Sequence, residues 1–163
     1  MVETLSQYGI KEEAIVWFDC ESFEEPDQYL EIFEALIALT VKQMKVEHVV
    51  SSYFHQTDEV TSVEHFIVVI TFLVDAKTYK MHLQCNGWFD DALVKYLNKV
   101  LDDLQSVSQR FQMIKTGDQS MVIVFVDQET ARKLDNAGLI DHEYHLEKTT
   151  FQNDFDKNGL PEA

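Results

Sequence analysis

Phe66-Ile-Val-Val-Ile-Thr-Phe-Leu-Val74 is a run of nine residues that contains no charge, no glycine and no proline. Its β-branched and aromatic residues favour a β-strand, and the run is too short to cross a bilayer. Alternate side chains of a strand point to opposite faces of the sheet, and both sets are apolar here except for Thr71. We therefore predict a central strand that needs a covering layer on each face.

Further strands are predicted on both sides of this run. Residues 46–55 are rich in β-forming residues but alternate poorly, which favours an edge strand. Residues 79–85 alternate apolar and polar side chains, which predicts a half-buried antiparallel strand in a hairpin with the central strand. A second hairpin is predicted from residues 110–115 and 121–126, and its second arm is apolar on both faces like the first run.

Three amphipathic helices are predicted from apolar residues that recur at i, i+3, i+4 and i+7. They span residues 26–44, 86–104 and 127–138, and the last begins at an aspartate cap and ends at a glycine. Lys42 and Lys45 are expected in the last turn of the first helix, where cations complement the helix dipole.

The predicted fold class is α+β, with the three helices and a single, largely antiparallel sheet of about five to six strands. The order is (β)-α-β-β-β-α-β-β-α, and its first strand is expected at residues 14–20. Residues 1–140 form one domain in this interpretation, which begins with an acidic N-terminal segment, residues 1–27. Residues 141–163 carry few apolar side chains and are predicted to form an acidic, polar tail.

The composition is strongly acidic. The 163 residues include 13 Lys and Arg against 29 Asp and Glu, which gives a formal net charge of −16. Nucleic acids and anionic membranes are disfavoured as ligands because they require positive charge, whereas a basic protein partner is favoured. No secretory signal is visible at the N-terminus, and the two cysteines, Cys20 and Cys85, lie in apolar contexts. We therefore expect free buried thiols and a cytoplasmic location.

The negative charge is concentrated at the N-terminus, because residues 1–35 carry ten acids and a single base. One interpretation is a solvated acidic face that keeps the protein soluble. The functional interpretation is a docking surface for a basic partner, in which the aromatic residues act as anchors if they are exposed. The predicted partner-binding residues are Glu12, Glu13, Trp17, Phe18, Glu21, Phe23, Glu24, Glu25, Asp27 and Glu31.

No decisive catalytic or metal-binding motif is present. Cys85 precedes a helix N-terminus, which favours a thiolate, but it continues an inward-facing strand pattern and we expect a packed core thiol. His142 and His145 are three residues apart, whereas zinc sites on helices use i, i+4 spacing. The acidic pair Asp90-Asp91 is expected to face solvent, where burial does not tune a pKa. We predict a non-enzymatic protein without a metal or cofactor.

The order of the predicted elements over residues 28–138, together with the acidity, resembles the small acidic chaperones of type III secretion. That resemblance implies a homodimer that holds an extended effector segment, although those chaperones normally begin with the helix. The segment from Arg110-Phe111 through Thr116-Gly-Asp-Gln-Ser120 to Ala131-Arg-Lys-Leu134 is similar to small bacterial toxin-immunity proteins. This second resemblance implies a cytoplasmic protein that occludes the active site of a toxin.

Three functional hypotheses follow. The favoured one is an immunity or antitoxin protein that neutralises a basic toxin domain by occluding its active site with an acidic surface. The alternative is a homodimeric secretion chaperone that binds an extended effector segment. The third is a hydrolase that depends on Cys85 or on a metal at His142 and His145.

Overall fold

The structure is a computed structural model that describes residues 1–62 and 64–142. Within these residues the chain forms four α-helices and six strands, and short 3-10 turns, η1 (Glu12–Ala14) and η2 (Cys20–Ser22), flank the first strand. The helices are α1 (Val2–Ser6), α2 (Asp27–Leu39), α3 (Ala92–Leu104) and α4 (Gln128–Asn136). The strands are β1 (Ile15–Asp19), β2 (Val46–Thr57), β3 (Glu64–Val74), β4 (Lys77–Cys85), β5 (Arg110–Ile114) and β6 (Ser120–Val126).

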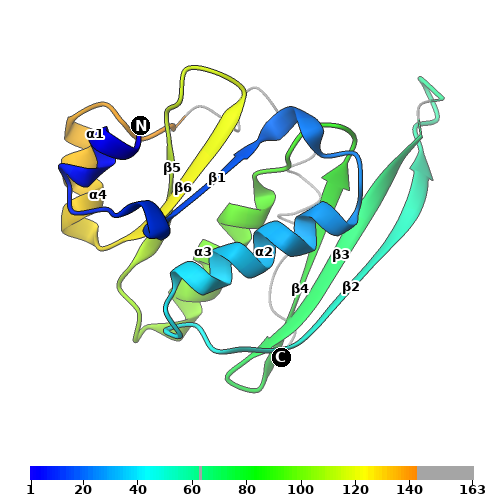
Figure 1. The fold of residues 1–163 in the computed structure, drawn as a ribbon. Helices are drawn as coiled ribbons and strands as arrows, with labels where there is room; N and C mark the ends of the chain where they lie inside the picture. The colour runs from blue at the N-terminus through cyan, green and yellow to red at the C-terminus, as the bar shows by residue number, and fades with distance from the viewer. Residues whose placement is uncertain (63, 143–163) are drawn as a thin grey trace.

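The strands form two separate antiparallel sheets of three strands each, in the orders β2-β3-β4 and β1-β6-β5. The α+β class is therefore confirmed, but the prediction of a single sheet of five to six strands is wrong. The physical reason is that α2 and α3 lie between the two sheets and keep them apart (Figure 1). Both hairpins were predicted correctly, but a hairpin pattern does not tell which hairpins share a sheet.

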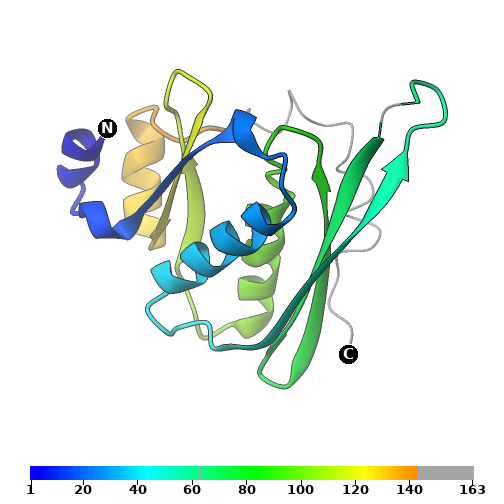
Figure 2. The same cartoon turned by 45° about the vertical axis from the view of Figure 1, so that its right-hand side comes forward.

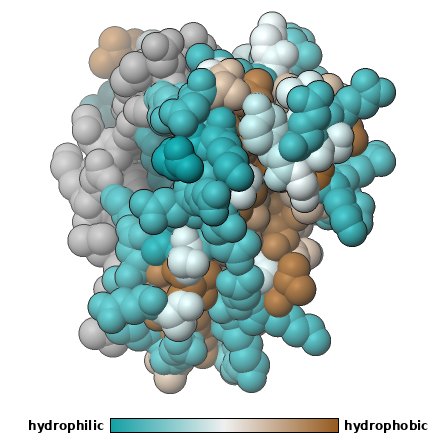
Figure 3. Space-filling model, turned by 90° about the vertical axis from the view of Figure 1, so that its left-hand side faces the viewer, coloured by the Kyte–Doolittle hydropathy of each residue, from teal (hydrophilic) through white to brown (hydrophobic). Residues whose placement is uncertain are grey.

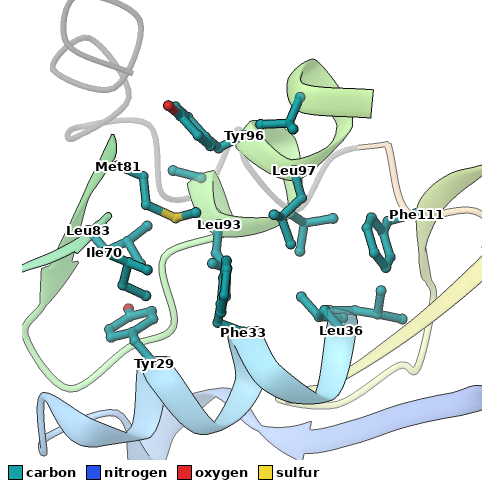
Figure 4. Packing of buried hydrophobic residues seen from close by; sticks show 14 of the residues in the cluster. Tyr29, Phe33, Leu36, Ile70, Met81, Leu83, Leu93, Tyr96, Leu97 and Phe111 are labelled. Carbon is teal, nitrogen blue, oxygen red and sulfur yellow. The ribbon is translucent and has the colours of Figure 1, made fainter. Parts of the chain in front are cut away.

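The molecule has four layers, which alternate between sheet and helix (Figures 1 and 2). The larger core cluster fills the α2–α3 layer and takes side chains from both sheets, as Figure 4 shows for Ile70 on one side and Phe111 on the other. Phe33 and Leu36 of α2 point toward Leu97 of α3 in the same view. A smaller cluster lies beneath α1 and α4, on the other face of β1-β6-β5.

The prediction of a central strand at residues 66–74 is confirmed, because β3 pairs with β2 on one side and β4 on the other. One face of β3 packs into the larger core cluster. The second apolar strand, β6, is also central, but in the other sheet. Its two faces enter different cores: Ile123 belongs to the larger cluster, and Val122 and Val124 belong to the smaller one.

Two of the predicted helix boundaries are wrong. Helix α2 ends at Leu39 because Val41 and Lys42 adopt positive φ angles of 49° and 66°, which stop a helix. Lys42 and Lys45 therefore lie beyond the helix and not in its last turn. Helix α3 begins at Ala92, because the preceding residues form a loop that donates backbone hydrogen bonds to the segment before α2.

The start and end of α4 agree with the prediction. The side chain of Asp127 accepts a hydrogen bond from the backbone N–H of Thr130 at 2.7 Å, which is an N-cap. Gly138 follows the helix with a φ of 70°, the left-handed geometry that glycine adopts most easily.

The acidic N-terminal segment belongs to the folded domain. The strand expected at residues 14–20 is confirmed as β1, which pairs with β6 from Ile15 opposite Val124 to Asp19 opposite Ser120. Helix α1 was not predicted, and its Leu5 is fully buried in the smaller cluster. Most of the predicted tail, residues 143–163, lies outside the described residues. None of the helices described is both long and apolar enough to cross a membrane.

Candidate functional site

The predicted acidic docking residues fall into two groups at the two ends of β1. Glu12 and Glu13 form η1 before the strand, whereas Glu21 and the acids that follow it lie after the strand and along the first turns of α2. A strand of five residues spans roughly 17 Å, so the two groups are separated by about that distance. Trp17 lies midway between them.

All seven predicted acids are exposed: Glu12, Glu13, Glu21, Glu24, Glu25, Asp27 and Glu31. None of them takes part in the ion pairs found among the described residues. Glu21 accepts a hydrogen bond from the side chain of Gln119 at 3.2 Å, which holds η2 against the turn between β5 and β6. Their charges are therefore available to an incoming partner.

The three aromatic residues predicted as anchors differ in exposure. Trp17 is 58% exposed, whereas Phe23 is 2% exposed and Phe18 is half-buried. Phe18 and Phe23 pack edge to face, with ring centroids 5.3 Å apart, and both contact Phe89 in the larger core. Phe23 is therefore a core residue and Phe18 packs against the same core, so Trp17 is the most exposed of the three aromatic residues. We call Trp17 and the seven exposed acids the Trp17 surface.

Strand alternation explains why only Trp17 is exposed. Val16 and Phe18 point toward the larger core, so Trp17 points to the other face of β1, the face that α1 and α4 cover. β1 is the edge of its sheet, and the ring is therefore not fully covered. The side of the molecule formed by α1 and α4 is mainly hydrophilic, with apolar residues only in small groups (Figure 3).

A second candidate surface, which the sequence analysis did not assign, is the free edge of β2. The strand was predicted at a sheet edge, and this is confirmed. Its large apolar residues Val50, Tyr53 and Phe54 are each at least half exposed, although they point to both faces of the sheet. The poor alternation of residues 46–55 was the signal in the sequence, because a strand with apolar residues on both faces at an edge needs cover.

Cys85 does not have the properties of a nucleophile. It is 2% exposed, and its thiol donates a hydrogen bond to the carbonyl of Phe23 at 3.5 Å. Burial raises the pKa of Cys85 to about 11, and the charges of Glu25 and Glu24 add to this effect. The thiol is therefore protonated at neutral pH. Cys20 is likewise buried and takes part in no disulfide, as expected.

The expectation that Asp90 and Asp91 face solvent is wrong. They belong to the loop before α3, where Asp91 is 1% exposed and forms an ion pair with Lys95 at 3.7 Å. Burial raises the pKa of Asp90 to about 6, against the opposing effect of backbone hydrogen bonds from Gln84 and Ala92. Because these hydrogen bonds hold the loop, we assign Asp90 a structural role.

The structure gives no support to a zinc site at the predicted histidine pair. His142 is exposed and its Nε2 lies 2.6 Å from a carboxylate oxygen of Asp135, while His145 lies outside the described residues. Within the described ranges, no group of three or more histidine, cysteine or acidic side chains is arranged to hold a metal ion.

No family model, no curated protein and no solved structure matches this chain.

Proposed function

We propose that this protein is a non-enzymatic binding protein that neutralises a basic protein domain, such as a bacterial toxin, by covering its active site with the Trp17 surface. The observation that carries the proposal is the exposed ring of Trp17 between two groups of exposed acids that form no ion pair with the residues that the structure describes. We expect the protein to act in the cytoplasm, where its two buried thiols remain reduced.

The chemistry of the Trp17 surface suits this role. Tryptophan is over-represented among the residues that dominate binding energies, because one rigid ring buries a large apolar area. Carboxylates around such an anchor accelerate the encounter with a basic partner and orient it. The separation of the two acid groups, about 17 Å, also fits within a standard interface of roughly 800 Å² on each partner.

The experiment is a comparison of matched variants in affinity purification from the source cell. The tagged protein is expected to retain a strongly basic protein, and two variants are expected to lose it: Trp17→Ala, and the joint reversal of Glu21, Glu24, Glu25 and Asp27 to lysine. With the purified pair, the reversal should slow association at low salt more than at high salt, because salt screens the charges.

The control is the reversal of Glu64 and Asp75 to lysine, two exposed acids at the start of β3 and just beyond its end, in the other sheet. This variant alters the net charge without touching the Trp17 surface, and it should retain the partner. If the four-acid reversal and Trp17→Ala bind the captured protein as well as the wild type, the Trp17 surface is not the docking site.

A further inference from the structure

From Val50 to Thr57, beyond the irregularity between Glu47 and Val50, the free edge of β2 carries no charged residue and no proline that would protect it from pairing. Exposed edges carry lysines, prolines or inward-pointing charges that prevent another strand from pairing. The twelve residues of β2 contain a single charged residue, Glu47, and expose Val50, Tyr53 and Phe54. The pairing with β3 is irregular between Glu47 and Val50 and regular from there to Thr57. This edge is therefore able to pair with an additional strand.

The charges at the two ends of β2 have opposite signs. Lys42 and Lys45 precede the strand, where Lys45 lies 3.4 Å from Glu47, and Asp58 and Glu59 follow it. If two copies of β2 pair antiparallel about a two-fold axis, the basic start of each strand lies beside the acidic end of the other. A uniformly basic or uniformly acidic peptide would meet a like charge at one end, so the charge pattern favours a second copy of this chain.

The residue types also define a register for this pairing. Two residues that face each other in an antiparallel pair have their side chains on the same side of the sheet. A two-fold axis perpendicular to the sheet must therefore place one residue of β2 opposite the same residue of the second copy, because an axis between two residues would oppose neighbours whose side chains point to different sides. With Ser52 opposite Ser52 of the second copy, Val50 lies opposite Phe54 on one face, twice. Ser51 of each copy then lies opposite Tyr53 of the other copy, on the other face of the sheet. No residue of β2 is placed opposite a residue with a charge of the same sign.

The tip between β2 and β3 provides a second point of contact. Val60 at this tip is 93% exposed. A carboxylate oxygen of Asp58 accepts hydrogen bonds from the backbone of Val60 at 2.8 Å and of Thr61 at 2.9 Å, which fixes the shape of the tip. These hydrogen bonds lower the pKa of Asp58, which is therefore fully ionised at neutral pH.

A hollow lies between the end of α2 and the start of β2. It has a volume of about 660 Å³ and is lined by Ile37, Ala38, Val41, Lys42, Met44, Lys45 and Val46. Its lining is apolar apart from the two lysines. With the two β2 strands paired antiparallel, the turn that follows β2 in one copy lies beside the segment that precedes β2 in the other, so that Asp58 and Glu59 lie near Lys42 and Lys45. An apolar tip flanked by acids thus meets an apolar hollow flanked by bases.

We propose that this chain forms a two-fold symmetric homodimer, in which the two β2 strands pair antiparallel about Ser52 and each β2–β3 tip enters the hollow of the other copy. The two β2-β3-β4 sheets become one six-stranded sheet. This interface goes beyond the proposed function and uses none of the residues of the Trp17 surface.

The register is tested with single cysteines and mild oxidation of the full-length protein. Ser52→Cys places two thiols directly opposite each other across the axis, so a disulfide-linked dimer is expected to form rapidly. Ser51→Cys is the matched control, because its direct neighbour is Tyr53 and the two new thiols are only diagonal to each other. It should cross-link at least about tenfold more slowly. Cys20 and Cys85 are buried and contribute little background.

The charge pairing is tested by sedimentation equilibrium. Lys45→Glu alone and Glu59→Lys alone should each raise the dimer dissociation constant about tenfold, because each change places like charges together at two symmetric contacts. The two changes combined should restore the wild-type constant. Lys11→Glu, which makes the same change in charge near the N-terminus, should leave it unaltered.

The outcomes separate the alternatives. A wild-type dimer with fast Ser52→Cys cross-linking and rescue by the combined charge reversal supports the proposal. A protein that is monomeric at its highest soluble concentration overturns it, and so does a dimer in which Ser51→Cys and Ser52→Cys cross-link equally slowly. An extended peptide that pairs with β2 of a monomer would likewise show that the occupant is not a second copy.

Discussion

The phenol oxygen of Tyr29 accepts a hydrogen bond from the backbone N–H of Asp90 at 2.7 Å. The same hydroxyl donates to the carbonyl of Gln84, also at 2.7 Å. Tyr29 is fully buried on α2, and its partners lie at the end of β4 and in the loop before α3. One side chain therefore connects three elements of the larger core and satisfies polar backbone groups of a loop that contains two acids.

Tyr29→Phe should destabilise the protein by about 1–3 kcal/mol, because it leaves buried polar groups without this partner while keeping the ring. Denaturant unfolding at neutral pH measures the change in the free energy of unfolding. Tyr8→Phe is the control, since Tyr8 packs at the margin of the smaller core. It should change stability by less than about 0.5 kcal/mol, and an equal loss in both variants would contradict the assignment.

Asp90 should make the native state less stable as the pH rises from 4 to 7. Its pKa of about 6 in the folded protein lies above the ordinary value of 3.8, so the folded state binds the proton more tightly than the unfolded state does. Its contribution is therefore present at low pH and is lost as the pH rises through about 6, at a cost of up to about 3 kcal/mol.

Unfolding titrations of Asp90→Asn test this prediction. The amide cannot ionise, so the variant should lose less stability than the wild type between pH 4 and pH 7. Asp118→Asn is a useful comparison, because a backbone hydrogen bond from Ser120 lowers the pKa of Asp118 and gives a contribution that is lost as the pH falls. Parallel curves for the wild type and Asp90→Asn would disprove the role of Asp90.

The two tryptophans should respond differently to a neutral quencher. Trp17 is 58% exposed, whereas Trp88 is half-buried against the larger core. In Trp88→Phe the remaining Trp17 should emit at longer wavelength and be quenched strongly by acrylamide. In Trp17→Phe the remaining Trp88 should emit at shorter wavelength and be quenched weakly. Equal quenching in the two variants would mean that the Trp17 ring is covered in solution.

Neither cysteine should react with iodoacetamide in the native protein at pH 7.5. Both thiols are buried, and burial raises the pKa of Cys85 to about 11, which removes the reactive thiolate. Mass spectrometry should show no alkylation under native conditions and two alkylated sites after denaturation. Rapid native alkylation of Cys85 would revive the hypothesis of a cysteine-dependent hydrolase.

The sequence was most informative where one residue pattern has one structural meaning. The uncharged run at residues 66–74 predicted β3 as a central strand, and Asp127 and Gly138 predicted the limits of α4. The hydrophobic pattern of the sequence was less informative about which of the two core clusters a buried side chain enters. Val122 and Ile123 are equally apolar neighbours, yet they enter different cores, and nothing local distinguishes these environments.

The sequence predicted the charge of the candidate site, but it did not predict which of its aromatic side chains are exposed. The acids from Glu12 to Glu31 are exposed, as a high density of carboxylates requires. Phe23 and Trp17 could not be distinguished from composition, because their exposure depends on the face of β1 and on the packing of Phe89. Asp90 was misplaced because a helix was expected to begin several residues earlier than Ala92.

β1 has β6 as its only strand partner within the described residues, and about a hundred residues separate the two strands in sequence. While the chain is being synthesised, β1 therefore has to wait until β6 has left the ribosome before it can pair. The ring of Trp17 and the acids on either side of it reach their final arrangement only after β6 has been synthesised. Translation products that stop before β6 should thus lack this surface.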